Sequence, residues 1–462
     1  MTGGEVSFER PLRAAVVGSG PAGFYAAGAL LASDEPPVEV DMIERLPTPW
    51  GLVRLGVAPD HPNLKAVSRA YERIAKQPRF RFLGNVHVGE ALRHADLVQL
   101  YDAVVYAFGA ETDRRLGIPG EDLSGSWAAT EFVAWYNGHP DFQHLSFDLS
   151  GERALVIGNG NVALDVARML ALRREELEPT DCTDAAIDAI TDSGIREIVV
   201  LGRRGPVQAS WTAPELQEMG ELAGADIVVD PAELELDPAS EAELAAAGPI
   251  VRRNMDLLRD FAHREPEGKL RRVVLRFRAS PVAILGESRV EAVEVVRNEL
   301  VPDERGRLRA VPTEDRDVIP CSLVFRSVGY RGVGLPGVPF DERAGVIPNR
   351  EGRVVDGDGE PLPGVYCAGW IKRGPTGVIG TNKKDATETV DRLLEDALAG
   401  RLQNSGAPAD GVLELLQERG VDVVAYAGWE SIDLRERGRG EEQGRPRIKL
   451  CSWDELLAAS RG

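Results

Sequence analysis

The chain has few of the residues that form redox or metal motifs. Its four cysteines, Cys182, Cys321, Cys367 and Cys451, lie far apart in 462 residues and never form C-x-x-C, and its six histidines are scattered. This spacing excludes a redox dithiol motif, a local cysteine-rich iron–sulfur site and a typical zinc ribbon. We therefore expect no metal site, and any electron chemistry would require a bound organic cofactor.

Net positive charge and long apolar runs are also lacking. The chain carries 54 Lys and Arg against 74 Asp and Glu, a formal net charge of −20 at pH 7, which argues against a nucleic-acid partner because such a protein needs a basic surface. No run of about 18 apolar residues predicts a transmembrane helix. The N-terminus lacks the basic and apolar segments of a secretion signal. We expect a globular cytoplasmic protein that binds neither nucleic acid nor membranes.

A glycine-rich turn lies between two predicted strands near the N-terminus. A short apolar strand over residues 14–17 leads into Gly18-Ser-Gly-Pro-Ala-Gly23, a G-x-G-x-x-G turn, and a helical run continues from Phe24 to Leu31. A second apolar run, Val38 to Ile43, ends at Glu44, 21 residues after Gly23. This order of strand, turn, helix, strand and acid is typical of a dinucleotide-binding βαβ unit.

Each residue type in that turn has a physical reason. Gly18 permits the tight turn, Gly20 lets the backbone approach a pyrophosphate, and Gly23 allows close packing of helix on strand. The helix N-terminus then faces the phosphates, and Glu44 can accept a hydrogen bond from a ribose hydroxyl.

The pattern occurs a second time with a different ending. A strand over residues 154–157 leads into Gly158-Asn-Gly-Asn-Val-Ala163, and a helical segment follows from Leu164 to Leu172. The next strand, Ile198 to Leu201, ends in Gly202-Arg203-Arg204 rather than in an acid. An arginine pair at this point suits a ribose 2′-phosphate, although a solvated pair is the ordinary alternative. The first turn therefore suits FAD or NAD, and the second NADP(H).

Two more segments indicate how the domains are arranged. Tyr101 to Ala110 and Gly364 to Ile371 both have the pattern of a buried strand that enters a glycine turn. Since the second glycine motif lies between them, we predict an α/β protein with two Rossmann-like domains, one inserted in the other. A discontinuous FAD-binding domain would span residues 1–110 and 330–462, and an NADP-binding domain residues 111–329.

The charge of the middle segment is uneven. Residues 215–247 hold ten acidic residues and no Lys or Arg, whereas residues 252–278 hold nine basic residues against four acidic ones. Such runs are usually solvated faces of helices or strands. A docking patch for a partner is the alternative that we keep for residues 252–278.

Stretches that match a known family are spread over residues 14–380 in that family's order. They are Val17-Gly-Ser-Gly-Pro-Ala-Gly-Phe-Tyr25, Pro49-Trp-Gly-Leu-Val-Arg54, Gly56-Val-Ala-Pro-Asp-His-Pro62, Gly158-Asn-Gly-Asn-Val-Ala-Leu-Asp-Val-Ala-Arg168, Gly202-Arg-Arg-Gly-Pro206 and Ala368-Gly-Trp-Ile-Lys-Arg-Gly-Pro-Thr-Gly-Val-Ile379. Together they resemble the adrenodoxin reductase-like ferredoxin–NADP⁺ reductases, which include actinobacterial NADPH–ferredoxin reductases. The resemblance implies a flavoprotein of glutathione-reductase-like architecture with FAD and NADP(H) as cofactors.

The resemblance also implies which residues bind these cofactors. FAD would contact Ala22, Glu44, Leu52 and Val86, with Trp370, Gly377, Val378 and Ile379 beside the isoalloxazine ring. NADP(H) would contact Arg114, Asn159, Gly160, Asn161, Val162, Arg203, Arg204, Glu215 and Gly377. A side chain at Gly377 would intrude between flavin and nicotinamide.

Three residues are candidates for the catalytic site. His61 lies in the motif Ala-Pro-Asp-His-Pro, which the resemblance places beside the flavin and the nicotinamide, although a lone loop histidine is more often structural. Asp165 and Glu215 are its possible companions through hydrogen bonds or water. Asp165 could equally be an acid on a helix surface. Hydride transfer itself needs positioning more than acid–base help.

The resemblance implies an NADPH:ferredoxin oxidoreductase, which passes a hydride from NADPH to FAD and then single electrons to a ferredoxin. The Ala-Gly-Trp at residues 368–370, in place of Gly-Asp, is the variant of this family. The alternatives are an NADPH-dependent flavin monooxygenase or oxidase, which leaves the His61 motif unexplained, and a non-catalytic flavin-binding protein. Because ferredoxins are acidic, docking would need a local basic patch on this acidic chain, and residues 252–278 are the candidate.

Overall fold

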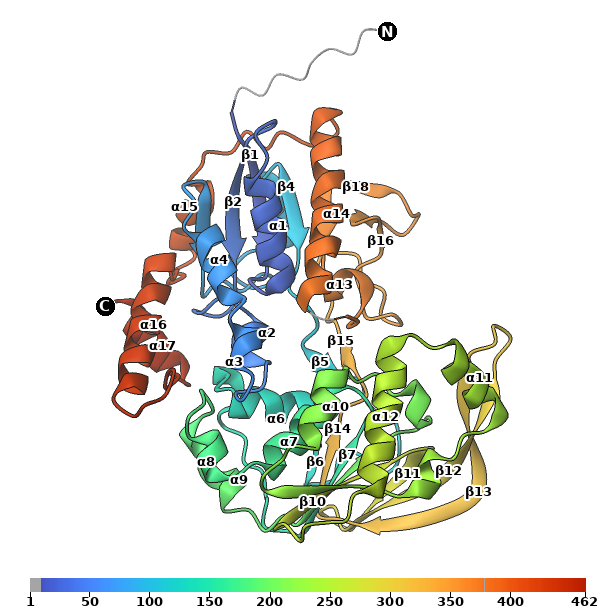
Figure 1. Ribbon diagram of the computed structural model, residues 1–462. Coiled ribbons are helices and arrows are strands. Elements are labelled where there is room, and N and C mark those ends of the chain that lie inside the picture. The colour runs from blue at the N-terminus through green and yellow to red at the C-terminus, as the bar shows by residue number, and fades with distance from the viewer. Residues whose placement is uncertain (1–9, 378) are drawn as a thin grey trace. The chain divides into compact units, whose positions relative to one another are not determined.

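The chain forms two compact units in the computed structural model, which describes residues 10–377 and 379–462 (Figure 1). The first unit consists of Met1–Val57, His61–Thr112 and Tyr330–Gly462, and the second of Ala58–Asp60 and Asp113–Gly329. The chain passes between them along two paired strands, β5 (Thr112–Asp113) and β15 (Tyr330–Arg331). Residues 58–60, expected in the first domain, thus group with the second unit.

The first unit is built on a sheet of seven strands in the order β16-β17-β18-β4-β1-β2-β3. The strands are β1 (Leu12–Val17), β2 (Val38–Ile43), β3 (Phe80–Leu83), β4 (Ala103–Tyr106), β16 (Asn349–Arg350), β17 (Arg353–Val355) and β18 (Pro361–Cys367). The five from β18 to β3 are parallel, and β16 and β17 form an antiparallel ribbon at the edge. A parallel sheet buried on both faces explains why these strands are continuous apolar runs rather than alternating ones.

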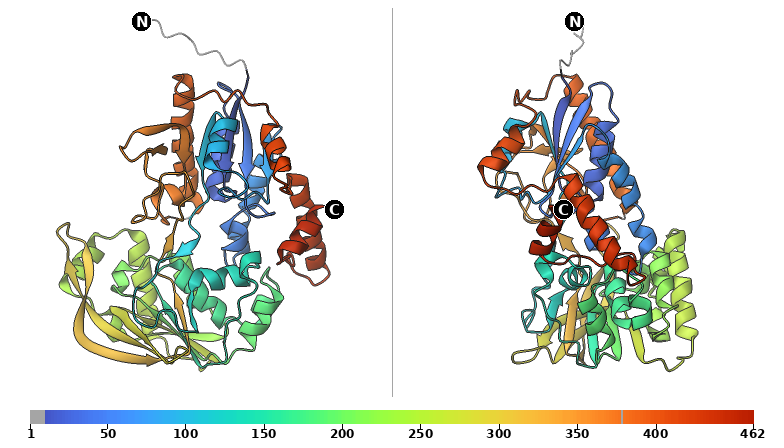
Figure 2. Two further views of the ribbon diagram at one scale, coloured as in Figure 1. Left: turned by 180° about the vertical axis from the view of Figure 1, so that it is seen from behind. Right: turned by 90° about the vertical axis from the view of Figure 1, so that its left-hand side faces the viewer.

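Two helices, α1 (Pro21–Leu31) and α14 (Ile379–Leu398), pack side by side on one face of this sheet (Figure 1). The others in the first unit are α2 (Leu52–Leu55), α3 (Pro62–Lys65), α4 (Ser68–Ala75), α5 (His94–Leu100), α13 (Trp370–Arg373), α15 (Gly411–Glu418), α16 (Tyr426–Glu441) and α17 (Trp453–Ser460). The last two form a packed pair (Figure 2). In the described part of the chain, no helix is both long and apolar enough to cross a membrane.

The second unit has a parallel sheet of six strands in the order β6-β14-β7-β8-β10-β9 and a separate antiparallel sheet, β11-β12-β13. The strands are β6 (Ser126–Ala128), β7 (Arg153–Ile157), β8 (Glu197–Leu201), β9 (Ala225–Val229), β10 (Arg271–Arg276), β11 (Ala279–Leu285), β12 (Ala292–Pro302), β13 (Leu308–Pro320) and β14 (Leu323–Arg326). The helices are α6 (Ala129–Tyr136), α7 (Asn161–Ala171), α8 (Arg174–Leu177), α9 (Asp184–Thr191), α10 (Ala213–Met219), α11 (Pro238–Ala246) and α12 (Pro249–His263), with short 3₁₀ turns η1 (Pro140–Phe142), η2 (Pro206–Gln208) and η3 (Pro231–Leu234).

The two parallel sheets repeat one topology. In the first unit β1 lies between β2 and β4, and in the second β7 lies between β8 and β14, so each glycine turn follows a strand at the point where the strand order reverses. Ligands bind at such switch points in open α/β sheets. The predicted fold class, two Rossmann-like α/β domains, is confirmed.

The side chains of the central strands explain why both faces are buried. Along β1, Ala14 and Val16 pack into the cluster under α1 and α14, whereas Ala15 and Val17 pack into the cluster on the other face. The period of two follows from the pleat of a strand. The buried residues of β7 divide in the same way between two clusters of the second unit.

We predict that Gly158→Ala destabilises the second unit. A Cβ at this position would lie 2.1 Å from the carbonyl oxygen of Ser327, which follows β14, so the strand ends must separate. The expected cost is about 1–3 kcal/mol, as for overpacking, measured by urea unfolding. Gly248→Ala is the control because a Cβ there meets nothing within 4 Å. An equal loss in both variants would contradict this account.

Candidate cofactor and active site

The first glycine turn has room for a ligand at one position and none at the other two. Gly18 has a φ of +103°, and a Cβ on it would lie 2.6 Å from the Cα of Phe108. A Cβ on Gly23 would lie 2.0 Å from the carbonyl oxygen of Gly18. Gly20, by contrast, has an ordinary φ of −76°, and a Cβ there would meet nothing within 4 Å. Gly18 and Gly23 are thus required by the fold, whereas Gly20 leaves open space at the N-terminus of α1.

Glu44 directly follows β2, and its carboxylate supports the glycine turn. Its carboxylate accepts hydrogen bonds from the N–H and Oγ–H of Ser19 at 2.9 and 2.7 Å, and from the N–H of Leu46 at 3.0 Å. A carboxylate accepts about four hydrogen bonds, so capacity for a further donor remains. The N–H of Val86 donates to the Glu44 carbonyl at 2.9 Å, and Val86 as a whole is buried.

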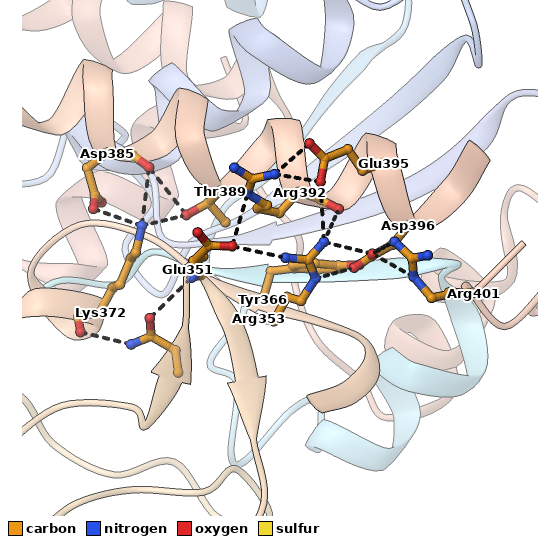
Figure 3. A network of polar contacts seen from close by, with 12 residues as sticks. Glu351, Arg353, Tyr366, Lys372, Asp385, Thr389, Arg392, Glu395, Asp396 and Arg401 are labelled. Atoms are coloured by element: carbon orange, nitrogen blue, oxygen red, sulfur yellow. Dashed lines mark hydrogen bonds and ion pairs between the residues drawn. The ribbon is translucent and has the colours of Figure 1, made fainter. Parts of the chain in front are cut away.

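The third predicted flavin segment approaches the same turn. Gly369 follows β18 with a φ of +78°, and a Cβ on it would lie 2.5 Å from the Cβ of Ala22. The buried carboxylate of Asp385 on α14 accepts the Gly369 N–H at 2.5 Å and pairs with Lys372 at 3.0 Å (Figure 3). This contact fixes the backbone immediately before Trp370.

The residues expected beside the isoalloxazine ring follow this backbone in the sequence. Trp370 is half-buried, its ring centroid lies 5.3 Å from that of Tyr330, and its buried Nε1 has no hydrogen-bond partner among the described residues. Leu52 at the start of α2 is exposed. Gly377 has a φ of +82°, and Ile379 opens α14. Val378 lies outside the described residues.

The second glycine turn is covered by the segment that follows β8. The carbonyl of Asn159 accepts hydrogen bonds from the N–H and Oγ–H of Ser210 at 3.0 and 2.9 Å. The Oδ1 of Asn161 accepts the Thr212 N–H at 2.9 Å and so ties α7 to the start of α10. The side-chain amide of Asn159 is buried, and neither of its polar atoms has a hydrogen-bond partner in the part of the chain described.

Two further residues of this turn line the start of α7. Gly160 has an extended backbone, and a Cβ on it would meet only the Ser210 Oγ at 3.5 Å. Val162, in the first turn of α7, is half-buried. The turn therefore offers the N-terminus of an 11-residue helix and the unpaired side-chain amide of Asn159. A helix N-terminus of this kind can bind a phosphate.

The guanidinium groups of the arginine pair after β8 form no ion pair among the described residues, and the acid that acts on Arg204 is Glu243, through its charge alone. Arg203 is exposed and Arg204 half-buried, and within residues 10–377 and 379–462 neither guanidinium has a hydrogen-bond or ion-pair partner. Burial lowers the pKa of Arg204, and the like charge of Arg203 lowers it further. A bound anion would relieve this repulsion.

The backbone of the pair is nevertheless held in place. Asn298 Nδ2 donates to the Arg203 carbonyl at 2.8 Å, and the N–H of Arg278 donates to the Arg204 carbonyl at 2.9 Å. Arg114 lies apart in the sequence, exposed after β5, with its N–H donating to the Gly329 carbonyl at 3.0 Å.

A buried arginine brings together two of the three catalytic candidates. Arg168 on α7 is almost fully buried and pairs with Asp165 at 2.8 Å, with Glu215 at 3.3 Å and with Asp60 at 2.7 Å. Burial opposes its charge, but the carboxylates, Asp165 foremost, raise its pKa. His61 is half-buried, caps the N-terminus of α3 and belongs to the first unit, whereas Asp165 and Glu215 belong to the second.

Sequence reasoning missed several residues that build these turns. Arg168 had a detectable signal, because it lies three residues after Asp165 on a helix, a spacing at which side chains meet. Asn298 had none, since it contacts a turn 95 residues away. Asp385 had none either, because no motif marks its contact with Gly369, 16 residues earlier.

None of the four cysteines, all of which lie in the described part of the chain, forms a disulfide. Burial raises the pKa of Cys321 to about 12 and that of Cys451 to about 11, and it also raises the pKa of Cys367. Since the thiolate is the reactive form, these three thiols are unreactive near neutral pH.

The basic segment 252–278 does not form a patch of unpaired charge. Arg271 is buried and donates to the backbone carbonyls of Leu170, Leu172 and Ile190. Acidic side chains pair with several others: Arg264 with Asp260, Arg272 with Glu197 and Arg276 with Asp317. A docking role for this segment stays a prediction.

Comparison with known proteins agrees with this geometry. Residues 12–200 match a family model described as pyridine nucleotide-disulphide oxidoreductase. NADPH-ferredoxin reductase FprA of Mycobacterium leprae is 52% identical over 454 residues, 97% of this chain and 98% of that protein. The mitochondrial NADPH:adrenodoxin oxidoreductase of Arabidopsis thaliana is 43% identical over 464 residues, 98% of this chain and 96% of that protein.

A solved structure extends the likeness to the whole fold. Mycobacterium tuberculosis FprA in complex with NADPH is 50% identical, covers 98% of this chain over 100% of its own length, and superposes with a TM-score of 0.93. The family expected from the sequence motifs is thereby confirmed. The chain belongs to the NADPH–ferredoxin reductase family.

Proposed function

We propose that this protein is an NADPH:ferredoxin oxidoreductase that carries electrons from NADPH through FAD to a ferredoxin-type iron–sulfur protein in the cytoplasm. The observation that carries the proposal is the pair of glycine turns at equivalent switch points, one followed by Glu44 and the other by Arg203 and Arg204. An acid suits a free ribose hydroxyl, and two cations suit a 2′-phosphate. The full-length similarity to reductases of this kind supports the same function.

In this proposal the first unit binds FAD. Gly20 admits the pyrophosphate at the N-terminus of α1, and Glu44 accepts a hydrogen bond from the ribose. Ala22, Leu52 and the backbone of Val86 complete the contacts. Trp370, Gly377, Val378 and Ile379 border the isoalloxazine ring, and the Asp385 carboxylate fixes the backbone that carries Trp370.

The second unit would bind NADP(H). The N-terminus of α7 at Gly160, Asn161 and Val162 receives the pyrophosphate, and the unpartnered amide of Asn159 supplies a donor and an acceptor. Arg203 and Arg204, joined by Arg114, hold the 2′-phosphate. Charged hydrogen bonds of this kind are about twice as strong as neutral ones.

Bound FAD supplies the exchange between a two-electron hydride donor and a one-electron acceptor. The protein contributes orientation, because hydride transfer depends mainly on the alignment of the reacting rings. Arg168 holds the carboxylates of Asp165 and Glu215 in place through ion pairs. We propose that these two acids and His61 border the reacting groups. The thiols of Cys321, Cys367 and Cys451 would take no part, since burial raises the pKa of each.

Gly20→Ala should separate cofactor binding from folding. The backbone at Gly20 accepts a side chain and a Cβ there meets no atom within 4 Å, so the stability of the FAD-free protein should not change. The added methyl group would occupy the space that the pyrophosphate needs, so FAD content per protein, read from flavin absorbance, should fall well below one. Gly357→Ala, another open position in the same unit, is the control. Stoichiometric FAD in the Gly20 variant would refute the assignment.

Replacing Arg203 and Arg204 by Ala should change coenzyme preference. Loss of charged hydrogen bonds to the 2′-phosphate should lower kcat/KM for NADPH by about 10–100-fold and leave kcat/KM for NADH within about threefold of the parent value. Steady-state reduction of ferricyanide with each coenzyme measures both. Arg343→Ala, which removes an exposed arginine in the first unit, controls for net charge. Equal losses with the two coenzymes would sink the 2′-phosphate assignment.

One experiment tests the whole proposal. Anaerobic NADPH should bleach the flavin absorbance of the purified protein, and reduction of cytochrome c should depend on added ferredoxin. Turnover that needs no ferredoxin and produces peroxide would favour an oxidase instead. If NADPH does not bleach the flavin absorbance, the protein is a non-catalytic flavin-binding protein instead.

A further inference from the structure

A tryptophan next to the first glycine turn has an unfavourable backbone conformation. Trp50 has a φ of +85°, which is an outlier for a bulky residue. Its N–H donates to the carbonyl of Ser19 at 3.1 Å. In the next residue, Gly51, a Cβ would lie 2.9 Å from the Cα of Gly20. Residues 50 and 51 therefore rest directly on the glycine turn, and we call them the supporting turn.

Aromatic packing holds Trp50 in this conformation. Its ring centroid lies 4.7 Å from that of Phe24 on α1, 5.7 Å from that of Tyr71 on α4 and 6.1 Å from that of Trp429 on α16. A strained backbone persists only where its surroundings over-determine it, and such strain gathers at functional sites. One of these three neighbours comes from the C-terminal part of the chain, in which the sequence shows no chemical motif.

A buried ion pair ties the same C-terminal helix to the supporting turn. Arg54, on α2 three residues after Gly51, donates to Glu436 of α16 at 2.8 and 2.5 Å, in a two-pronged contact. Arg54 is 5% exposed and Glu436 0%, and the Arg54 guanidinium also lies 5.2 Å from the ring centroid of Trp429. Figure 2 shows α16 beside its partner α17 at the end of the chain.

The Glu436 carboxylate has further hydrogen-bond donors around it. Besides Arg54 it accepts hydrogen bonds from Arg447 at 3.0 Å and from the Leu450 N–H at 2.9 Å. Charges buried in this way add little stability compared with apolar residues, but removal of one partner leaves the other unpaired and is strongly destabilising. The pair therefore couples the position of α16 to the position of α2.

We propose that Glu436 is a positioning residue for FAD binding: through Arg54 and Trp429, helix α16 holds the supporting turn against Gly20 and keeps the phosphate-binding turn in its binding conformation. This proposal rests on the assignment of the Gly18–Gly23 turn to FAD. The C-terminal segment would then support the cofactor site, although none of its residues is expected to contact FAD.

A second buried acid in the same unit provides the matched control. Asp396 pairs with Arg353 at 2.8 Å and Arg401 at 2.5 Å and accepts the Tyr366 hydroxyl at 2.8 Å (Figure 3). Asp396 lies 17 residues after Ile379, the first residue of α14. At 1.5 Å per residue, the two residues are about 25 Å apart along the helix axis. Loss of its charge should weaken the unit without touching the supporting turn.

The test compares Glu436→Gln with Asp396→Asn in the full-length holoprotein. One measurement is the rate of FAD release after dilution of the holoprotein, followed by the rise in flavin fluorescence. The other is hydrogen exchange of the amides at residues 54–57, which donate to the carbonyls of Gly51 and Leu52. We expect Glu436→Gln to release FAD at least about tenfold faster, the equivalent of 1.4 kcal/mol, and to exchange faster at these amides. Asp396→Asn should change neither, even if its melting temperature falls.

Arg54→Lys covers the case in which Glu436→Gln does not fold. Lys keeps the positive charge opposite Glu436 but loses the two-pronged contact, so an intermediate rate of FAD release is expected. Release from Glu436→Gln or Arg54→Lys no faster than from Asp396→Asn overturns the proposal. If Gly20→Ala also keeps its FAD, the assignment of the turn fails; if Gly20→Ala loses FAD, only the role of Glu436 fails.

Discussion

The architecture depends on the close approach of a turn to the end of a neighbouring strand. In the first unit Gly18 lies against Phe108 after β4, and in the second Gly158 lies against Ser327 after β14. Both contacts leave no space for a Cβ atom, so the helix that follows each turn starts directly beside the switch point of its sheet. Equivalent hydrogen bonds to the strand on the other side support this geometry. The Gly18 N–H donates to the Ile43 carbonyl at the end of β2 at 2.8 Å, and the Gly158 N–H donates to the Leu201 carbonyl at the end of β8 at 3.0 Å.

Much of this could be predicted from the sequence because its causes are local. Glycine spacing, apolar runs and the residue that ends the second strand are read within about 30 residues, and β2 begins and ends where the apolar run does, at Val38 and Ile43. The strand after the second turn is likewise confirmed as β8, which ends at Leu201 just before the arginine pair. The assignment of individual cofactor contacts remains a prediction.

The rest could not be predicted because it depends on contacts between residues far apart in the chain. Arg54 and Glu436 are separated by 382 residues, and Arg203 and Asn298 by 95. A lone acid in a charged helix such as α16 carries no sign that it is fully buried.

The insertion of the second unit determines the order in which the protein can assemble. The strand β18 and the helix α14 complete the first unit, yet they begin only at Pro361 and Ile379, after all of Asp113–Gly329. Because synthesis proceeds from the N-terminus, the first unit leaves the ribosome with an incomplete sheet, and β4 keeps an unpaired edge until β18 arrives. The inserted unit has all its strands by Arg326 and can fold first. An edge that waits this long for its partner is the point at which a nascent chain is most exposed to aggregation.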